Sequence, residues 1–327
     1  MIQTRLVQFI LGLGLGLGLA ACSNGTSFGI GEQNATFDSS IKYNNKVDII
    51  WVVDDSSSMQ QHQQTLSSQI GGMVAKLNAL KMDYRMVVTT TSVGSGYTGG
   101  KYLGSPAVLT ASTPNLVGIL QSRLIPGEAG SDKEQGILSL DNLLSNSYVS
   151  GDGQGFHRDE SLLLINILSD EDDQTDGTSA SVEQALKSRL DQLKQPFRPN
   201  VGGWLVNFIG VKDTTCKNAL GFSPIGTRYL DLVQASGGDS FSICDVNLED
   251  AVSKLQARVL EIITDYPLSV VPDVNSIKVY MNGVLIPHSS LNGWDYIPSL
   301  KVIRFYGTAV PSAAVSVKVD FTPAGAS

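Results

Sequence analysis

The chain has 327 residues, a formal net charge of −8 at pH 7, 42% hydrophobic residues and 17% charged residues. This length and hydrophobic content are sufficient for one sizeable globular core and a smaller second domain. The acidic balance argues against a nucleic-acid-binding protein, because the phosphate backbone selects basic surfaces.

Residues 1–21 are typical of an export signal. One basic residue, Arg5, precedes an apolar, glycine-rich stretch that ends in small residues and is short for a membrane-spanning helix. The last residues, "LAAC", resemble the lipobox of bacterial lipoproteins, which implies a lipid anchor on Cys22. The serine after Cys22 favours the outer membrane of a Gram-negative cell envelope. A plain secretory signal with a chance cysteine is the alternative. Residues 22–43 are mostly small and polar, which predicts a flexible tether.

The remaining cysteines are Cys216 and Cys244. In an oxidising compartment, a disulfide between them is the economical interpretation, and two buried thiols are the alternative. The histidines His62, His157 and His288 lie far apart in the sequence without the spacing of metal ligands. The sequence therefore shows no zinc site.

Strand-like and helix-like segments alternate between residues 44 and 266. The strand-like segments are nearly continuous apolar runs, which is typical of a parallel sheet with helices on both faces. We therefore predict an α/β domain with a doubly wound, mainly parallel sheet, and an irregular segment or hairpin at 97–109. The predicted strands are 47–53, 84–91, 161–169, 204–211 and 239–244, and the predicted helices are 59–80, 115–125, 133–144, 181–194, 227–236 and 248–266.

The pattern changes at residue 267. Asn282 and Gly283 lie between two apolar runs and form a hairpin signal. Residues 314–321 alternate between apolar and polar side chains without a helical period. We predict that residues 267–327 form a small antiparallel β domain. The predicted inward residues of its last strand are Val315, Val317, Val319 and Phe321.

Oxygen-bearing side chains follow the first apolar strand directly. In an extended segment, residues two apart point the same way, so Asp54, Ser56 and Ser58 direct one carboxylate and two hydroxyls at one place. The apolar strand 161–169 is followed by Asp170, and a neighbouring parallel strand brings this carboxylate beside Asp54. Ligands bind beyond the carboxyl ends of such strands, and oxygen ligands suit Mg²⁺.

The strand followed by D-x-S-x-S-M, a hydroxyl-bearing loop and a strand ending in "LSD" resembles the von Willebrand factor A family with its metal-ion-dependent adhesion site. The resemblance covers residues 44–266, and the loop hydroxyl is found by counting back from Gly136. It implies a Mg²⁺ site, with Mn²⁺ and Ca²⁺ as alternatives, that binds a protein partner offering a carboxylate. The ligand set that it implies is Asp54, Ser56, Ser58, Ser131 and Asp170.

Several other interpretations stay open. Ser58 and Gln61 match a helix capping box, which would explain one serine without a metal. An enzyme is the main rival class, but the chain has no G-x-x-x-x-G-K-[ST] motif and no histidine near either aspartate in sequence, so we expect no enzymatic activity. A structural envelope lipoprotein with an unused metal site is the third possibility.

The acidic segment 172–183 has part of the spacing of a calcium-binding loop. Gln174 and Ser179 stand where other residue types are expected, and a strand rather than a helix precedes the segment. We interpret it as a solvated acidic turn that caps the following helix at Ser181.

Overall fold

The computed structural model describes residues 41–42, 44–197, 202–221, 223–245, 248–311 and 315–325. The predicted signal peptide, the acylation site at Cys22 and the tether up to residue 40 lie outside the described residues. Within the described part of the chain, no helix is long and apolar enough to cross a bilayer.

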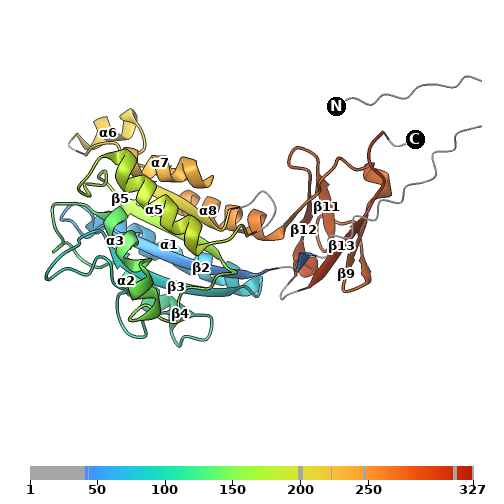
Figure 1. Ribbon diagram of the computed structural model, residues 1–327, viewed down its shortest axis with the longest axis horizontal. Helices are drawn as coiled ribbons and strands as arrows, with labels where there is room; N and C mark the ends of the chain where they lie inside the picture. Colours follow the sequence, from blue (N-terminus) through green and yellow to red (C-terminus); the bar gives the residue numbers. More distant parts are fainter. Residues whose placement is uncertain are drawn as a thin grey trace, which may run out of the picture. The chain divides into compact units, whose positions relative to one another are not determined.

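The largest sheet has six strands in the order β4-β3-β2-β5-β6-β7, with helices on both faces (Figure 1). All neighbouring strands are parallel except β4, which pairs with β3 in the antiparallel direction. The predicted α/β architecture with a mainly parallel sheet is therefore confirmed. The strands are β2 (Lys46–Val53), β3 (Asp83–Thr90), β4 (Leu109–Thr110), β5 (Leu162–Ser169), β6 (Trp204–Gly210) and β7 (Ser240–Ser242).

A hydrophobic core lies on each face of this sheet, because side chains alternate along its strands. Ile49 and Trp51 of β2 belong to one core, and Ile50 and Val52 belong to the other. All four are fully buried. The first core contains α1 (Gln60–Ala79), α2 (Leu116–Arg123) and α8 (Leu248–Thr264), and the second contains α3 (Gly136–Leu143), α5 (Ser179–Leu193) and α7 (Thr227–Ser236).

The boundaries differ from the sequence prediction in several places. Helix α3 begins at Gly136 rather than at residue 133, and residues 97–109 are irregular up to β4. The short helices α4 (Asn146–Ser150) and α6 (Thr214–Leu220) were not predicted.

The predicted cap at Ser181 is wrong. Thr178 caps α5, and its side chain accepts a hydrogen bond from the Ser181 amide. Thr178 has the extended backbone that a capping residue needs, whereas Ser181 already lies within the helix. The acidic turn before α5 is also not fully solvated, because Asp173 is buried and accepts a hydrogen bond from the Ile137 amide at the start of α3.

Two small antiparallel sheets share a hydrophobic core of their own, and all their strands except β1 follow the parallel sheet in sequence. Their strand orders are β1-β13-β9-β10 and β11-β12-β8. Asn282 and Gly283 join β9 to β10 with positive φ angles of 48° and 80°, as a tight hairpin turn requires. The strands are β1 (Ile41–Lys42), β8 (Asp265–Pro267), β9 (Lys278–Met281), β10 (Val284–Ile286), β11 (Trp294–Ile297), β12 (Val302–Phe305) and β13 (Ser316–Asp320).

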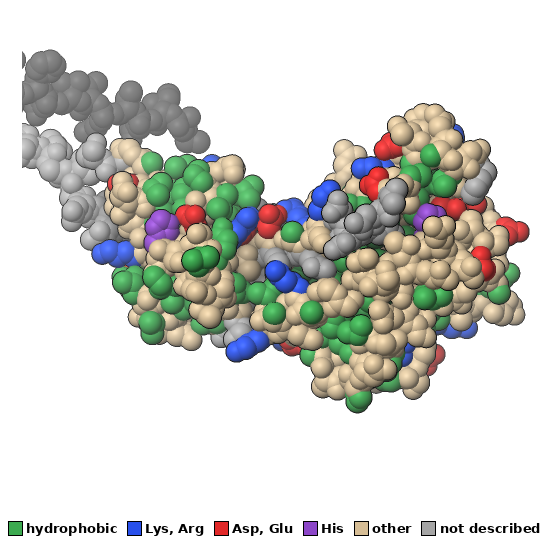
Figure 2. Space-filling view, turned by 180° about the vertical axis from the view of Figure 1, so that it is seen from behind, with side chains coloured by type: hydrophobic (Ala, Val, Ile, Leu, Met, Phe, Trp, Pro, Cys, Tyr) green, Lys and Arg blue, Asp and Glu red, His purple; other side chains and the backbone are tan. Residues whose placement is uncertain are grey.

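The packing of β13 follows the predicted alternation. Val317 and Val319 are buried, and Phe321 packs against the same core. Val315 differs from the prediction, because it lies before β13 and packs against the first core of the parallel sheet. Figure 2 shows hydrophobic side chains gathered on the surface of the antiparallel sheets, and Leu291 is 78% exposed.

Two predicted boundaries need correction. Residues 41–42, assigned to the tether, form β1, which pairs with β13. Residues 265–266, assigned to the last helix, begin β8, which pairs with β12. In both cases pairing with a distant strand, which short-range patterns do not reveal, decides the local structure.

The predicted disulfide between Cys216 and Cys244 is confirmed, with the two Cα atoms 5.5 Å apart. It joins α6 to the segment after β7. A cross-link between residues 28 positions apart stabilises the folded state by roughly 3 kcal/mol through the entropy of the unfolded chain.

A buried ion-pair network lies at the amino end of β2. The Asp48 carboxylate is fully buried and accepts hydrogen bonds from the Arg158 side chain at 2.8 Å and from the Arg158 amide at 2.9 Å. The Lys194 ammonium lies 3.9 Å from the same carboxylate. Burial lowers the pKa of Lys194 to about 8, although the charge of Asp48 acts in the opposite direction.

We predict that Asp48→Asn lowers the free energy of unfolding by about 3–5 kcal/mol, because it removes the buried carboxylate that pairs with Lys194 and leaves Arg158 paired with Asp83 alone. Urea unfolding measures the change. Glu160→Gln is the control, since it removes the exposed pair with Lys46 and should change the free energy by less than about 1 kcal/mol. Equal, small effects of the two substitutions would contradict the role assigned to Asp48.

Candidate metal site

The carboxyl ends of β2 and β5 meet at one edge of the parallel sheet. Val53 lies opposite Leu168 in the strand register, and the Asp54 amide donates a hydrogen bond to the Leu168 carbonyl oxygen at 2.9 Å. Asp54 and Asp170 are therefore the residues that emerge from two adjacent strands at this edge.

A chain of hydrogen bonds connects four of the five predicted ligands. The Ser58 hydroxyl donates to the Asp170 carboxylate at 3.2 Å, and the Ser56 and Ser58 hydroxyls lie 3.3 Å apart. The Ser56 amide donates to the Asp54 carboxylate at 2.9 Å. The structure therefore brings two carboxylates and two hydroxyls together, in the arrangement expected from the D-x-S-x-S spacing.

The Asp54 carboxylate is fully buried. Burial raises its pKa to about 6, and the nearby charge of Asp170 acts in the same direction. Hydrogen bonds from the Ser169 hydroxyl at 2.6 Å and from Ser56 lower the pKa, but they do not offset burial. The site therefore places a carboxylate where its own negative charge is unfavourable unless a cation or a proton accompanies it.

Asp55 binds a neighbouring loop instead of this cluster. Its carboxylate accepts a hydrogen bond from the Ser92 hydroxyl at 2.6 Å, and its carbonyl oxygen accepts one from the Gly130 amide at 2.8 Å. A Cβ atom on Gly130 would lie 2.4 Å from that carbonyl oxygen, so only glycine allows the close approach. The Gln63 side chain adds a second link, because it donates to the carbonyl oxygens of Asp54 and Gly127.

Ser131 lies on this loop but faces its own backbone. Its hydroxyl accepts a hydrogen bond from the Lys133 amide at 3.0 Å, and its amide donates to the Ser92 hydroxyl at 2.8 Å. Within the described residues, its hydroxyl has no hydrogen bond to the other four predicted ligands. The assignment of Ser131 stays a prediction from the resemblance.

The capping-box interpretation of Ser58 is wrong. The residue that caps α1 is Met59, without a side-chain hydrogen bond to the helix. The Ser58 hydroxyl is directed to Asp170 instead. The role of Ser58 therefore lies in the strand-end cluster.

Glu134 is a residue of this site that the sequence analysis missed. It is fully buried on the loop between Ser131 and α3. Burial, followed by the charge of Asp54, raises the pKa of Glu134 to about 9. The nearby Thr91 hydroxyl opposes this shift, although the pair lacks the geometry of a hydrogen bond. The sequence did offer one signal for this residue: Glu134 is an acidic residue in the predicted ligand loop, three residues after Ser131.

The acidic segment after β5 does not form a second site of this kind. The Asp172 carboxylate accepts a hydrogen bond from the Arg228 amide at 2.9 Å, and Asp173 accepts bonds from the amides of Ile137 and Thr175. These carboxylates hold α3 and α7 against the end of β5. Because both carboxylates are bonded to backbone amides, the segment is better interpreted as a structural turn than as a calcium-binding loop.

Among the residues that the structure describes, no three carboxylate, imidazole or thiolate side chains lie close enough together to hold a metal ion by themselves. Two carboxylates with the hydroxyls of Ser56 and Ser58 nevertheless fit the preferences of Mg²⁺, which takes oxygen ligands and retains several water molecules. Burial raises the pKa of Asp54, and a bound cation would offset the unfavourable negative charge of this buried carboxylate.

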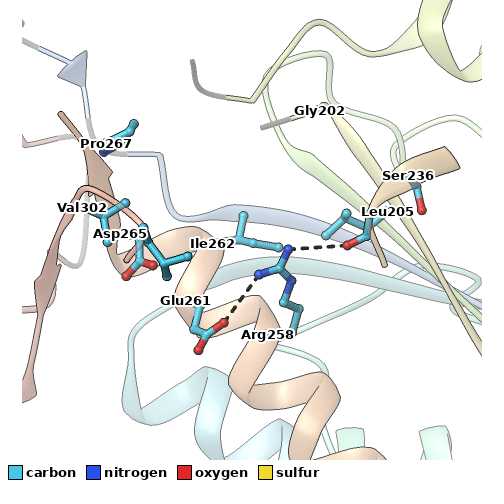
Figure 3. A pocket seen from close by; sticks show the side chains of 11 residues that line it. Gly202, Leu205, Ser236, Arg258, Glu261, Ile262, Asp265, Pro267 and Val302 are labelled. Carbon is cyan, nitrogen blue, oxygen red and sulfur yellow. Dashed lines mark hydrogen bonds and ion pairs between the residues drawn. The ribbon is translucent and has the colours of Figure 1, made fainter. Parts of the chain in front are cut away.

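A cavity of about 310 Å³ lies away from the strand ends, beside α8 and β12 (Figure 3). The Arg258 guanidinium in its wall lies 3.5 Å from the Glu261 carboxylate and 3.5 Å from the Gly237 carbonyl oxygen. Because these charged groups pair with each other and with the backbone, we place the candidate site at the strand ends rather than in this cavity.

No protein-family model matches the chain, and no curated protein matches it. Solved structures similar to it include proximal thread matrix protein 1 from the mussel byssus, with 13% identity, a TM-score of 0.42, and coverage of 70% of this chain and 51% of that chain. A second structure of that protein is described as having a zinc-occupied MIDAS motif (TM-score 0.42, 13% identity, 71% and 51% coverage). Another is the pilus adhesin SpaC from Lactobacillus rhamnosus GG in an open conformation (TM-score 0.45, 14% identity, 86% and 39% coverage).

The chain thus spans about half the length, or less, of the solved chains that it matches. TM-scores of 0.42 and 0.45 at these identities are too low to assign it to a family.

We predict a pH dependence of stability that originates at Glu134. In the folded protein, the pKa of Glu134 is about 9 instead of its ordinary 4.5, so the folded state holds a proton that the unfolded chain has lost. The free energy of unfolding therefore falls as the pH rises between these values. Glu134→Gln removes this contribution.

The measurement is urea unfolding of wild type and Glu134→Gln in EDTA between pH 5 and 9. Because Lys194 titrates in the upper part of the range, the informative quantity is the difference between the two proteins. We expect the variant to gain stability relative to wild type as the pH rises. A difference that stays constant with pH would show that Glu134 has an ordinary pKa.

Proposed function

We propose that this protein binds a divalent cation at the carboxyl ends of β2 and β5 and uses it to bind a protein partner. Mg²⁺ is the first candidate, with Mn²⁺ and Ca²⁺ as alternatives. The observation that carries the proposal is the hydrogen-bonded cluster of Asp54, Ser56, Ser58 and Asp170. The fifth predicted ligand, Ser131, is implied by the sequence resemblance alone, and the proposal stands on the other four residues.

The burial pattern of the cluster supports a site that is open on one side. Asp54 and Asp170 are buried, whereas Ser58 is exposed. Oxygen ligands from the protein would therefore approach the ion from within, and its outward side would face solvent. A bound cation supplies a Lewis-acidic position at which a carboxylate of the partner replaces water.

We further propose that the protein acts at the bacterial cell envelope, anchored through an acylated Cys22, most simply in the outer membrane. The parallel-sheet domain would bind the partner, and residues 265–327 together with β1 would form the smaller β domain. In this proposal the protein is a recognition module rather than an enzyme. The supporting observations are the lipobox-like sequence and the absence from the sequence of the nucleotide-binding motif G-x-x-x-x-G-K-[ST].

Mg²⁺ is expected to stabilise the wild-type protein and not Asp54→Asn. A ligand that binds only the folded state raises the free energy of unfolding by about 2.7 kcal/mol at 100 times its Kd. Asp54→Asn removes a charged ligand while keeping the shape of the side chain. Urea unfolding with Mg²⁺ or with EDTA measures the effect.

Asp176→Asn is the matched control for this experiment, because the Asp176 side chain is 91% exposed and pairs only with Lys133 among the described residues. It should respond to Mg²⁺ as wild type does. Stabilisation of Asp54→Asn by Mg²⁺ to the wild-type extent would contradict the proposed site.

Partner binding is expected to depend on the same ion. Capture of proteins from cell envelopes or target cells with the immobilised chain should recover a specific partner in Mg²⁺, but not in EDTA and not with Asp170→Ala. The proteins are identified by mass spectrometry. Recovery of the same partner in EDTA and by Asp170→Ala would instead favour a structural envelope protein with an unused metal site.

A further inference from the structure

Glu134 is an acidic residue inside the protein whose carboxylate has no partner. Its side chain is 0% exposed, and within the described residues neither carboxylate oxygen accepts or donates a hydrogen bond. Buried polar groups are nearly always hydrogen-bonded, and a buried carboxylate without a partner is especially unfavourable. A carboxylate in this state indicates a ligand or a bound water that completes its surroundings.

The surroundings of Glu134 are those of the proposed cation site. The Gln135 amide donates to the Thr91 carbonyl oxygen just beyond β3, and the Gln174 amide donates to the Glu134 carbonyl oxygen from the segment after β5. The charges that act most strongly on the Glu134 carboxylate are those of Asp54, Asp55 and Glu171, all of them negative. Glu134 is therefore held at the carboxyl edge of the sheet, close to Asp54.

Ser131, the residue that the resemblance places at the ion, differs from Glu134 in its hydrogen bonding and in its burial. Its hydroxyl already accepts a hydrogen bond from the Lys133 amide, and it is only partly buried. The Ser131 amide donates a hydrogen bond to the Ser92 hydroxyl, and this hydroxyl in turn donates to the Asp55 carboxylate. Ser131 is therefore tied to Asp55, which does not belong to the cluster. The loop therefore offers a buried carboxylate without a hydrogen bond and a hydroxyl that is already bonded, and we expect it to act on a cation through the carboxylate.

We infer that Glu134, rather than Ser131, is the residue through which the loop 127–135 stabilises the cation, by accepting a hydrogen bond from a water molecule in the ion's coordination shell. The inference rests on the proposed cation site. A contact through water fits the spacing, because no three carboxylate, imidazole or thiolate groups of the described residues lie close enough together to ligate one ion directly. It also fits Mg²⁺, which retains several of its water molecules.

Without a cation Glu134 holds a proton, and a bound cation would displace it, which would give the site a third negative charge. Asp54 and Asp170 alone balance the two charges of the cation, and Glu134 adds a further acid on the buried side while Ser58 stays exposed. The outward position of the ion is unaffected, because Glu134 approaches from inside. Glu134 therefore strengthens retention of the ion without occupying the position proposed for the partner.

Isothermal titration calorimetry with Mg²⁺ alone and with Mn²⁺ alone, on the purified whole chain, compares wild type with the neutral variants Glu134→Gln and Ser131→Ala. We expect Glu134→Gln to raise the Kd for both cations by about 10–100-fold, the usual effect of removing a partner of a metal-bound group. We expect Ser131→Ala to bind as wild type does. Circular dichroism in EDTA establishes that each variant is folded.

The inference would be overturned if Glu134→Gln bound the cations with wild-type affinity. It would also be overturned if Ser131→Ala bound them more weakly while Glu134→Gln did not. If Glu134→Gln does not fold, Glu134→Asp takes its place, because it keeps the charge and withdraws the carboxylate by one methylene. It should raise the Kd several-fold, and an unchanged Kd would overturn the inference. Failure of the proposed function gives a different result, in which wild type itself binds neither cation.

Discussion

The parallel pairing of β2 with β5 places two carboxylates at adjacent strand ends, and most features of the candidate site follow from this constraint. The Asp54 backbone is held beside the end of β5, because its amide is bonded to the Leu168 carbonyl oxygen of the neighbouring strand. The serines of the D-x-S-x-S segment then turn toward the two acids and connect them. The cluster is a consequence of strand register, and its charge requires a cation or protons to balance it.

Buried acidic residues have cationic partners at the amino end of the parallel sheet but not at its carboxyl end. At the amino end, Asp48 lies within 2.7 Å of Arg158 and within 3.9 Å of Lys194, so its charge is balanced by the chain itself. At the carboxyl end, no lysine, arginine or histidine of the described residues forms an ion pair with Asp54, Asp170 or Glu134. The first arrangement serves stability, and the second leaves a negative site that an external cation would complete. This difference is the physical basis of the proposed function.

The sequence predicted the features that depend on short-range patterns. The apolar runs and their spacing gave the parallel sheet, and the D-x-S-x-S spacing brought Asp54, Ser56 and Ser58 together as expected. It did not predict β1, because two residues form a strand only through pairing with β13. It also missed Glu134, because its burial depends on the ends of β3 and β5, which lie far from it in the chain. The capping interpretation of Ser58 failed for the same reason, since Asp170 is 112 residues away.

The most direct test of the account is anomalous X-ray diffraction from crystals of the protein grown with Mn²⁺. The account predicts an anomalous peak within coordination distance of the Ser56 and Ser58 hydroxyls and of the Asp54 or Asp170 carboxylate. A saturating concentration of Mn²⁺ that leaves this edge of the sheet without a peak would contradict it. So would a peak found only at surface carboxylates elsewhere on the chain.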